Sequence, residues 1–379
     1  MLILQIICLS FTISYVILMI LYRRGWRLQP QFKVEDSYSP FIRISVIIPA
    51  RDEARNIGNC IESLLAQDYP RELLEVIVVD DHSSDNTAAI VESFGQPNIR
   101  CIALADYVAA GQTVAYKKAA LSAGIANSNG ELIITTDADC VASPSWLRHL
   151  AAFYEMKKPV MIAGPVDFTT NGSFVQLFQS LDFMSMQGIT AAANRLGLGS
   201  MSNGANLAFS RDAFNQVEGY KGVDHLASGD DYLLMVKMQA AFPGKIGYLK
   251  AEEAIVRTPP QPDWTSFFQQ RIRWASKSGK YDDSKITGIL SLVYLFNFSL
   301  AALLIAGLFY PWFLIVGAAM LIVKIIVELW FLYPVAKFYN KTQELLLFPF
   351  LQPLHIAYIV SAGLLGFIGV YKWKGRTVK

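Results

Sequence analysis

Two aspartates near the middle of the chain, Asp137 and Asp139, are separated by one residue and directly follow the apolar run Leu132–Thr135. Carboxylates at the end of a buried strand are unfavourable unless a cation, a ligand or a basic side chain neutralises them. On extended backbone a spacing of two places both side chains on one side, so they can hold a single divalent cation. Oxygen ligands suit Mg²⁺ or Mn²⁺ carrying a phosphorylated substrate. The pattern predicts a metal-assisted transfer enzyme, with a purely structural acid pair as the alternative.

Two further acidic pairs stand where a ligand site is expected. Asp80 and Asp81 follow an apolar run and open into a turn, and their oxygens can accept hydrogen bonds from a nucleobase and ribose hydroxyls. Asp230 and Asp231 precede an apolar helix start, where the helix dipole keeps a carboxylate ionised and ready to accept a proton. Helix capping is the competing interpretation of both pairs.

Two polar segments add groups suited to a phosphorylated sugar. Lys117 and Lys118 begin a helix of small residues, whose N-terminus attracts phosphate, and the sequence leaves open which of the two points inward. The segment 202–206 contains Asn203 and Gly204 ahead of another apolar run. Its glycine permits close backbone approach and its two amides can bind hydroxyls, although a structural turn explains the segment equally well.

A helix with two different sides is predicted between residues 264 and 277. One side suits a membrane and the other a site, so the helix would lie in the membrane interface, with Arg271 reaching towards lipid headgroups. On the polar side Arg273 can pair with a diphosphate and Trp274 can form a floor beneath the acceptor. A plain interfacial helix is the alternative. Helical spacing collects Trp264, Phe267, Phe268, Ile272 and Ala275 on the apolar side and Gln270, Arg273, Trp274 and Lys277 on the polar side.

Short β-branched runs alternate with helical stretches between residues 44 and 256. This alternation predicts a mostly parallel sheet covered by helices, with ligands bound beyond the carboxyl ends of the strands. The acidic pairs stand at such ends. Strands are predicted at 44–48, 75–79, 99–103, 132–135, 160–163 and 205–209, and helices at 55–66, 115–126 and 146–156.

The two ends of the chain are membrane-like. Hydrophobic residues make up 53% of the sequence, and the first 21 residues are uncharged and run into a basic border that includes Arg23 and Arg24. This predicts a spanning anchor with its N-terminus outside. Near the other end, the apolar runs 286–309 and 312–332 are predicted to span the membrane. Lys324 and Glu328, four apart in the second run, line a path for acceptor or product or form a neutralised pair, and we favour the pair.

The last apolar run, residues 345–371, is interrupted by Pro349 and Pro353 and is followed by a basic tail. Three full C-terminal spans would place that tail outside, against the preference of basic residues for the cytoplasm. Either the tail is translocated, or part of this run is re-entrant or interfacial.

Composition excludes several functions. A net charge of only +2 argues against nucleic-acid binding as the main activity. The four cysteines are scattered without paired spacing, which indicates neither a disulfide framework nor a zinc site and fits a reduced cytoplasmic domain. A transporter would place broken helices in repeated halves, and no repeat is found.

Five motifs in order resemble the membrane-embedded family 2 glycosyltransferases, inverting enzymes that include ceramide glucosyltransferase and the cellulose, chitin and hyaluronan synthases. The resemblance covers roughly residues 44–280. A lone DxD is common by chance, whereas five motifs in order are specific. They are Ile47-Ile48-Pro49-Ala50-Arg51-Asp52-Glu53, Val78-Val79-Asp80-Asp81-His82-Ser83-Ser84-Asp85, Thr136-Asp137-Ala138-Asp139, Gly229-Asp230-Asp231 and Gln270-Arg271-Ile272-Arg273-Trp274.

The resemblance implies an α/β protein with a GT-A (Rossmann-like, nucleotide-sugar-binding) domain, one N-terminal and two to three C-terminal transmembrane helices. The expected domains are a transmembrane anchor at 1–22, the GT-A domain at 43–260, an amphipathic interfacial helix with the QxxRW motif at 261–284 and a membrane domain at 285–379. An integral protein of the inner or plasma membrane with a cytoplasmic catalytic domain follows.

The resemblance also assigns roles. Asp231 would be the catalytic base, Asp139 the principal metal ligand and Asp137 its partner, with Mg²⁺ or Mn²⁺ as the cofactor. Gly229 stands where many members have another residue, and Asp230 where many have Glu. The substrate-binding residues implied are Asp80, Asp81, Lys117, Asp137, Asp230, Asn203, Gly204, Gln270, Arg273 and Trp274.

We therefore predict an inverting glycosyltransferase of glycolipid biosynthesis. It would move a hexose from a nucleotide sugar, with UDP as the expected nucleotide, to a membrane lipid acceptor. A processive polysaccharide synthase, which would take a growing saccharide as acceptor, is the alternative, because similar motifs serve both. A non-catalytic sugar-nucleotide-binding membrane scaffold is the second alternative. The expected partners are the donor, the acceptor and membrane lipids, with no nucleic acid.

Overall fold

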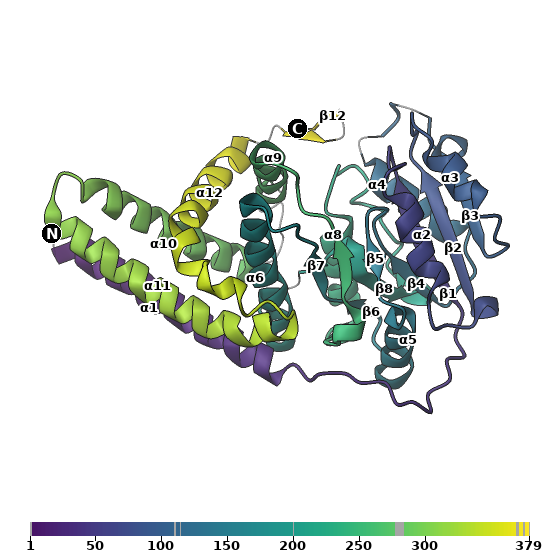
Figure 1. The fold of residues 1–379 in the computed structure, drawn as a ribbon, viewed down its shortest axis with the longest axis horizontal. Helices are drawn as coiled ribbons and strands as arrows, with labels where there is room; N and C mark the ends of the chain where they lie inside the picture. Colours follow the sequence, from purple (N-terminus) through teal and green to yellow (C-terminus); the bar gives the residue numbers. More distant parts are fainter. Residues whose placement is uncertain are drawn as a thin grey trace. The chain divides into compact units, whose positions relative to one another are not determined.

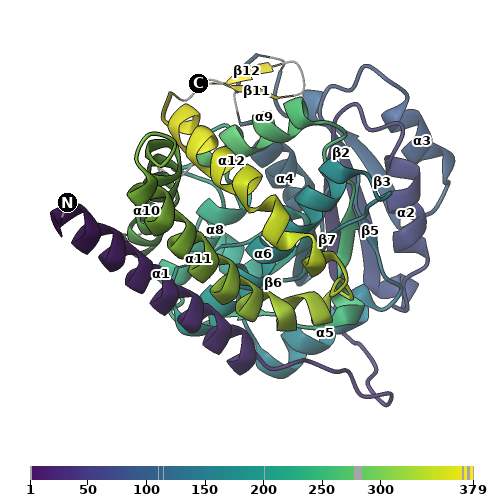
Figure 2. The same cartoon turned by 60° about the vertical axis from the view of Figure 1, so that its left-hand side comes forward.

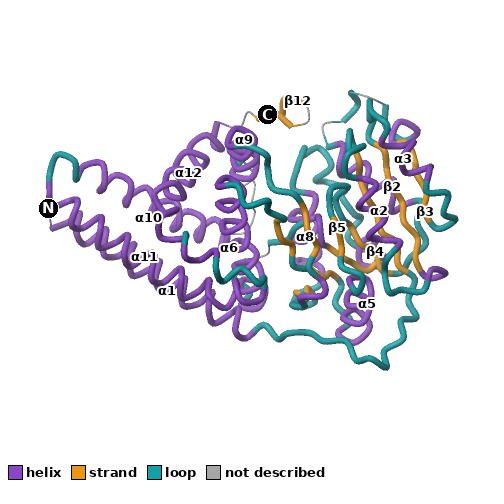
Figure 3. The backbone as a smooth tube through the Cα atoms, viewed as in Figure 1, coloured by secondary structure: helices purple, strands orange, loops and turns teal. Residues whose placement is uncertain are grey.

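The computed structural model describes residues 2–109, 111–113, 115–199, 201–276, 284–368, 371–373 and 376–378. Lys277, predicted on the polar side of the interfacial helix, and Lys374 in the basic tail lie outside the described residues. The chain forms two compact units (Figures 1 and 3). The catalytic unit comprises Pro30–Thr169 and Ser200–Pro259, and the helical unit comprises Met1–Gln29, Thr170–Gly199 and Pro260–Lys379.

A seven-stranded mixed sheet forms the centre of the catalytic unit, in the strand order β3-β2-β1-β4-β8-β6-β9. Strands β1 to β4 pair in parallel, whereas β8 runs antiparallel to both β4 and β6. The predicted α/β class is confirmed. The strands are β1 (Ile44–Ala50), β2 (Leu74–Asp80), β3 (Ile99–Ala103), β4 (Leu132–Thr135), β6 (Met161–Ala163), β8 (Leu207–Ser210) and β9 (Ile246–Tyr248).

The central strands are apolar along their length because both of their faces are buried. Ile47 in β1, Ile77 in β2 and Ile133 in β4 are each fully buried. In the parallel register Ile44 pairs with both Leu74 and Leu132, so the carboxyl ends of β1, β2 and β4 lie at one edge of the sheet. The acidic pairs that follow β2 and β4 therefore start from the same edge.

Helices and short elements surround this sheet. Helix α4 packs closely on it, since a methyl group at Gly124 would lie 2.5 Å from Ile47 Cγ2. The helices are α2 (Ile57–Leu65), α3 (Thr87–Ser93), α4 (Tyr116–Ala126), α5 (Trp146–Lys157), α7 (Arg211–Gln216) and α8 (Asp230–Ala241). A small second sheet contains β5 (Val141–Ala142), β10 (Val256–Thr258) and β7 (Val166–Phe168), and 3₁₀ turns occur at η1 (Arg71–Leu73), η2 (Leu104–Asp106), η3 (Gly204–Asn206) and η4 (Glu252–Ala254).

Among the residues that the structure describes, the helical unit has four helices long and apolar enough to cross a membrane, one N-terminal and three C-terminal. They are α1 (Leu2–Leu28), α10 (Ser284–Ala306), α11 (Pro311–Phe338) and α12 (Phe348–Ile368). The other elements are α6 (Phe174–Leu196), α9 (Trp264–Ala275), η6 (Glu344–Leu346) and the hairpin β11 (Tyr371–Trp373) with β12 (Arg376–Val378). Helix α6 was not predicted, and its residues were assigned by pattern to the 43–260 domain, whose boundaries stay a prediction.

Helices α1, α10 and α11 lie side by side (Figure 2). The Tyr15 ring of α1 stacks on Phe296 of α10 at 4.3 Å, and its hydroxyl donates to Glu328 of α11. Further along, Trp26 packs edge-on against Phe338 at 5.5 Å, so α1 and α11 run in the same direction. Lys324 Nζ lies 2.7 Å from Glu328 Oε1, which confirms the neutralised pair predicted from their spacing.

Candidate active site

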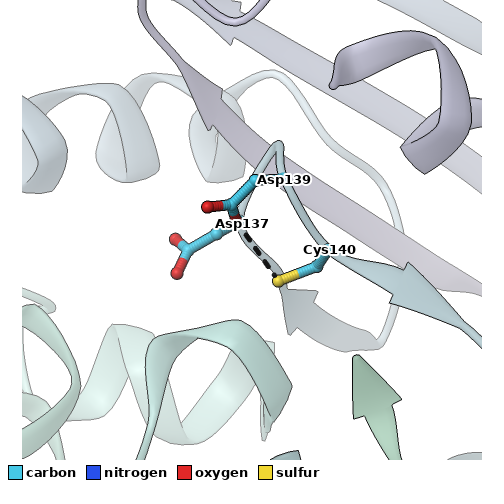
Figure 4. Close-up of side chains that lie close together, drawn as sticks. All are labelled: Asp137, Asp139 and Cys140. Atoms are coloured by element: carbon cyan, nitrogen blue, oxygen red, sulfur yellow. Dashed lines mark hydrogen bonds between the residues drawn. The ribbon is translucent and has the colours of Figure 1, made fainter. Parts of the chain in front are cut away.

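The loop after β4 presents the central acidic pair. The ligand atoms of Asp137, Asp139 and Cys140 all lie within 4.8 Å of one another (Figure 4). Both carboxylates are partly exposed, whereas the thiol is buried and its Sγ lies 3.6 Å from Asp139 Oδ1. The two-residue spacing thus brings the acids together as predicted. Cys140, which scattered cysteine spacing gave no reason to select, lies directly beside them.

These side chains fit a hard divalent cation. Burial raises the pKa of the Cys140 thiol, and the nearby negative charges of Asp137 and Asp139 raise that pKa further, so the sulfur stays protonated near neutral pH. The two carboxylates offer oxygen donors, which suit Mg²⁺ or Mn²⁺.

A lysine from α4 reaches the same acids. Lys117 Nζ lies 2.7 Å from Asp137 Oδ1 and 3.4 Å from Asp230 Oδ2. Its neighbour Lys118 is buried and donates to the carbonyl oxygens of Leu226 and Ser228, at 2.5 and 2.9 Å. The structure thus shows which of the two lysines points towards the acids, a question that the sequence left open. Lys117 belongs to the acidic cluster, and Lys118 holds the loop that leads to Asp230.

Gly204 and the acidic pair of α8 complete the cluster. A methyl group on Gly204 would lie 3.2 Å from Asp230 Oδ2, 3.3 Å from Lys117 Nζ and 3.9 Å from Asp231 Cβ. Asp230 is buried and Asp231 is partly exposed. Asp231 Oδ1 accepts the Tyr232 amide at 2.8 Å, so this carboxylate also stabilises the first turn of α8. The preceding Gly229 has φ +79°, a left-handed conformation that favours glycine.

The electrostatics of the cluster favour a charged lysine. Burial by itself lowers the pKa of Lys117, but the carboxylates of Asp137, Asp230 and Asp231 outweigh that effect and raise the pKa above its ordinary value. One cation therefore stands among several acids. This arrangement keeps Lys117 positively charged within the acidic cluster.

The acids after β2 lie in a second polar group within the catalytic unit. Asp81 is buried, with Oδ1 3.0 Å from His82 Nδ1 and 3.8 Å from Arg51 Nη1. Asp80 Oδ2 accepts the Ser83 amide, whereas Asp80 Oδ1 and His82 Nε2 are buried without a hydrogen-bond partner among the described residues. Buried polar atoms left unpaired are rare, and a ligand is one means of satisfying them.

The side-chain amides of the 202–206 turn bind other groups of the protein. Asn203 Oδ1 accepts the Ala205 amide at 3.0 Å. Asn206 is fully buried, with Oδ1 accepting from Trp146 Nε1 and Nδ2 donating to the carbonyls of Pro165 and Ala254. Both side-chain oxygens, Asn203 Oδ1 and Asn206 Oδ1, therefore make the structural contacts that a turn would need. A contact between Asn203 and substrate stays a prediction.

The QxxRW residues lie in the helical unit, on α9. Arg271 is only 4% exposed, and its Nε and Nη2 donate to Asp182 Oδ2. The expectation that Arg271 reaches towards lipid headgroups is wrong, because a buried carboxylate 89 residues earlier binds it. Phe267, expected on a membrane-facing side, is also buried, and its ring lies 5.6 Å from that of Phe178 on α6. Gln270, Arg273 and Trp274 are partly exposed.

Comparison with known proteins now gives the family. The sequence matches the model described as Glycosyl transferase family 2 over residues 45–217 and that of Glycosyl transferase family group 2 over residues 132–338, more than half of the chain. The chain belongs to the family 2 glycosyltransferases. The family resemblance drawn from the five motifs is confirmed, and with it the predicted GT-A fold.

Curated relatives are distant. Glycosyltransferase AglE of Haloferax volcanii is 29% identical over 194 residues, which is 51% of this chain and 59% of that protein. A beta-monoglucosyldiacylglycerol synthase of Synechocystis is 25% identical over 260 residues, which is 65% of this chain and 50% of that protein. The matches thus span 59% and 50% of the length of these two relatives.

One solved structure matches nearly end to end. The mannosyltransferase PcManGT of Pyrobaculum calidifontis, in complex with GDP-Man and Mn²⁺, is 20% identical with a TM-score of 0.59. The match covers 96% of this chain and 98% of that one. This likeness supports the shared fold.

Proposed function

We propose that this family 2 member is an inverting, metal-dependent hexosyltransferase that moves a sugar from a nucleotide donor to a hydroxyl of a membrane lipid. One observation carries the proposal. Lys117 lies against Asp137 and Asp230, and Gly204 lies against Lys117, Asp230 and Asp231. Segments far apart in the sequence therefore bring acids, a lysine and a closely packed glycine together.

This group can divide the work of glycosyl transfer. The acceptor oxygen forms a bond to the anomeric carbon while the bond from that carbon to the diphosphate breaks, and Asp231 takes the acceptor proton. Asp231 suits this role because it is partly exposed and lies in the first turn of α8, where the helix dipole favours the ionised form. Lys117 offers positive charge to the departing diphosphate.

A divalent cation, Mg²⁺ or Mn²⁺, would be held by Asp139 and Asp137 and would supply neutralisation of the charge on the leaving diphosphate. The buried, unpaired atoms Asp80 Oδ1 and His82 Nε2 support a nucleoside site beside Asp81. We assign Gln270, Arg273 and Trp274 to the diphosphate and acceptor on the family motif.

The membrane helices of this chain and one of its relatives support a lipid acceptor. Four helices suited to a membrane belong to the same chain, and one distant relative is named a synthase of a glucosylated diacylglycerol. A lipid substrate would enter from the bilayer and need no soluble carrier. The basic border at Arg23, Arg24 and Arg27 favours a cytoplasmic catalytic unit.

The test is a transfer assay on the full chain in lipid nanodiscs with Mg²⁺ or Mn²⁺, membrane lipid extract and a panel of UDP-, GDP- and ADP-sugars. Mass spectrometry should find one discrete glycolipid, formed from one donor class. Asp231→Asn should reduce transfer by at least about a hundredfold, because the general base is removed, while nucleotide affinity is kept.

The alternatives give different results in the same assay. A ladder of lengthening saccharides would replace the lipid proposal by a processive synthase. Nucleotide-sugar binding without any turnover would support the non-catalytic scaffold. Near-normal transfer by Asp231→Asn would show that the base is misassigned.

A further inference from the structure

A buried ion pair lies directly behind the QxxRW residues of the helical unit. Asp182, on α6, is 6% exposed, and its Oδ2 accepts from Arg271 Nη2 at 2.7 Å and from Nε at 3.1 Å. Its other oxygen accepts from Tyr358 Oη at 2.5 Å and lies 3.7 Å from His355 Nε2, both on α12. Both carboxylate oxygens are thus engaged, one by α9 and the other by α12.

The guanidinium held by Asp182 in turn contacts two residues of the motif. Arg271 Nη1 donates to Gln270 Oε1 at 2.6 Å, and its Cζ lies 4.3 Å from the centre of the Trp274 ring. Both distances are those of direct contact, a charge-assisted hydrogen bond and a cation–π stack. The ring of Phe267 lies 4.6 Å from the same Cζ. The Arg271 guanidinium therefore holds the Gln270 side-chain amide on one side and the Trp274 indole on the other.

We propose that Asp182 is a positioning residue, which acts through Arg271 to orient Gln270 and Trp274 for substrate. The inference rests on the proposed function for the step from orientation to catalysis. Truncating one member of a buried pair leaves the other charge uncompensated. Without the carboxylate, Arg271 turns towards other acceptors and releases both motif side chains.

The experiment compares Asp182→Asn, Trp274→Ala and the double variant, as full chains in nanodiscs. Asp182→Asn should lower transfer on the order of tenfold, since small misplacements of binding groups have large kinetic effects, with nucleotide affinity unchanged. The double variant should lose less than the product of the two single losses, because both changes remove the orientation of Trp274. Multiplicative losses, or normal transfer by Asp182→Asn, would overturn the proposal.

A spectroscopic readout separates this inference from the proposed function. The contribution of Trp274 to fluorescence is the difference between each protein and the same protein carrying Trp274→Phe. That contribution should shift with Asp182→Asn and stay constant with Glu328→Gln, a matched change at a different buried ion pair of this unit. A shift together with normal transfer by Trp274→Ala would refute the proposed role of Trp274 and keep the positioning. If Asp182→Asn fails to fold, Tyr358→Phe, which removes one bond to Asp182, should give the same shift in weaker form, and an unchanged spectrum would refute it.

A separate set of contacts concerns the course of α12. The stack of Tyr15 on Phe296 and its bond to Glu328 mark one level across α1, α10 and α11. Near the start of α12, Gln352 Nε2 donates to Glu328 Oε2 at 3.0 Å. Near its end, a methyl group on Gly363 would lie 2.5 Å from the ring of Tyr294, two residues before Phe296.

Gln352 and Gly363 are separated by eleven positions, a rise of about 16 Å in an α-helix. If α12 ran alongside α1, α10 and α11, Gln352 and Gly363 would contact those helices at positions about 16 Å apart along their axes. Both residues instead contact them close to the level of Tyr15. The last turn then packs against the end of α9, because a methyl on Gly366 would lie 2.7 Å from Ala275 Cβ. In Figure 1 the start of α1 and the turn between α10 and α11 lie at the same end of this unit, and α12 lies away from that end.

We infer that α12 lies across the bundle as a re-entrant helix, and that the C-terminal tail is on the same side of the membrane as Arg23, Arg24 and Arg27. This topology puts the basic tail where the charge rule prefers it, although α12 is apolar enough to span.

Labelling of single cysteines by a membrane-impermeant maleimide in sealed vesicles of both orientations tests this topology. In a Cys101→Ser background, which leaves only the three buried native thiols, Thr377→Cys reports the tail. Leu28→Cys at the end of α1 and Leu308→Cys in the α10–α11 turn report the two sides. Thr377→Cys should label together with Leu28→Cys. Labelling together with Leu308→Cys would show that α12 spans.

Discussion

Gly204→Ala tests the acidic cluster with the smallest possible change. The new methyl would lie 3.2 Å from Asp230 Oδ2 and 3.3 Å from Lys117 Nζ, closer than ordinary van der Waals contact, so one or both must move by a few tenths of an ångström. The backbone at Gly204 does not have a positive φ, so alanine meets no conformational strain there. Any effect therefore comes from displacement of the cluster.

The magnitude follows from that displacement. A misplacement of about 1 Å at a reacting site can reduce a rate about a hundredfold, so a few tenths of an ångström should reduce kcat roughly threefold to tenfold. Transfer kinetics on purified protein measure this, together with thermal unfolding to verify the fold. The matched control is Gly58→Ala in α2, where the nearest atom to the new methyl is 4.0 Å away and where alanine favours the helix. Equal kcat for both variants and the wild type would refute the arrangement of Lys117, Asp230 and Gly204 as a reacting cluster.

Three further predictions concern neighbouring residues. Asn206→Ala should lower the free energy of unfolding by about 3 kcal/mol, because it leaves the Trp146 indole N–H and two buried carbonyls without hydrogen-bond partners. Chemical denaturation would measure this loss, and a change below about 1 kcal/mol would contradict the buried network. Asp139→Asn should weaken Mn²⁺-dependent nucleotide binding by at least about tenfold and leave metal-free binding unchanged, as measured by calorimetry with and without EDTA; equal affinity in both conditions would argue against a metal there. Lys118→Met should lower kcat more than nucleotide affinity, because it releases the loop that leads to Asp230. If only nucleotide affinity fell, Lys118 would instead bind the nucleotide-sugar donor.

Local pattern was enough to locate the acids. Apolar β-branched runs that end in Asp80 and Asp137 predict neighbouring parallel strands, and parallel strands bring their carboxyl ends to one edge. Apolar runs predicted the anchor and two C-terminal spans and left the third C-terminal run open between a span and a re-entrant or interfacial segment. Spacing along one segment predicted the Lys324–Glu328 pair. Family membership followed because five motifs kept their order.

Other features required the folded chain. Adjacent residues of a helix point about 100° apart, and only packing shows that Lys117 faces the acids while Lys118 faces a loop. The sequence pattern predicted neither helix α6 nor a role for its Asp182. That role depends on a contact with Arg271, which lies far along the chain. The available signal was that Asp182 is the one acidic residue between positions 174 and 196, but this names no partner.

By itself the sequence determined the fold class and the membrane-like ends and located the acidic pairs, because these follow from composition and from periodicity within single segments. Only the tertiary structure decided which lysine joins the carboxylates, that Arg271 is buried, and that α12 meets its neighbours at one level. These outcomes depend on contacts between distant segments, and such contacts are set by the packing of the whole unit, which no local pattern encodes.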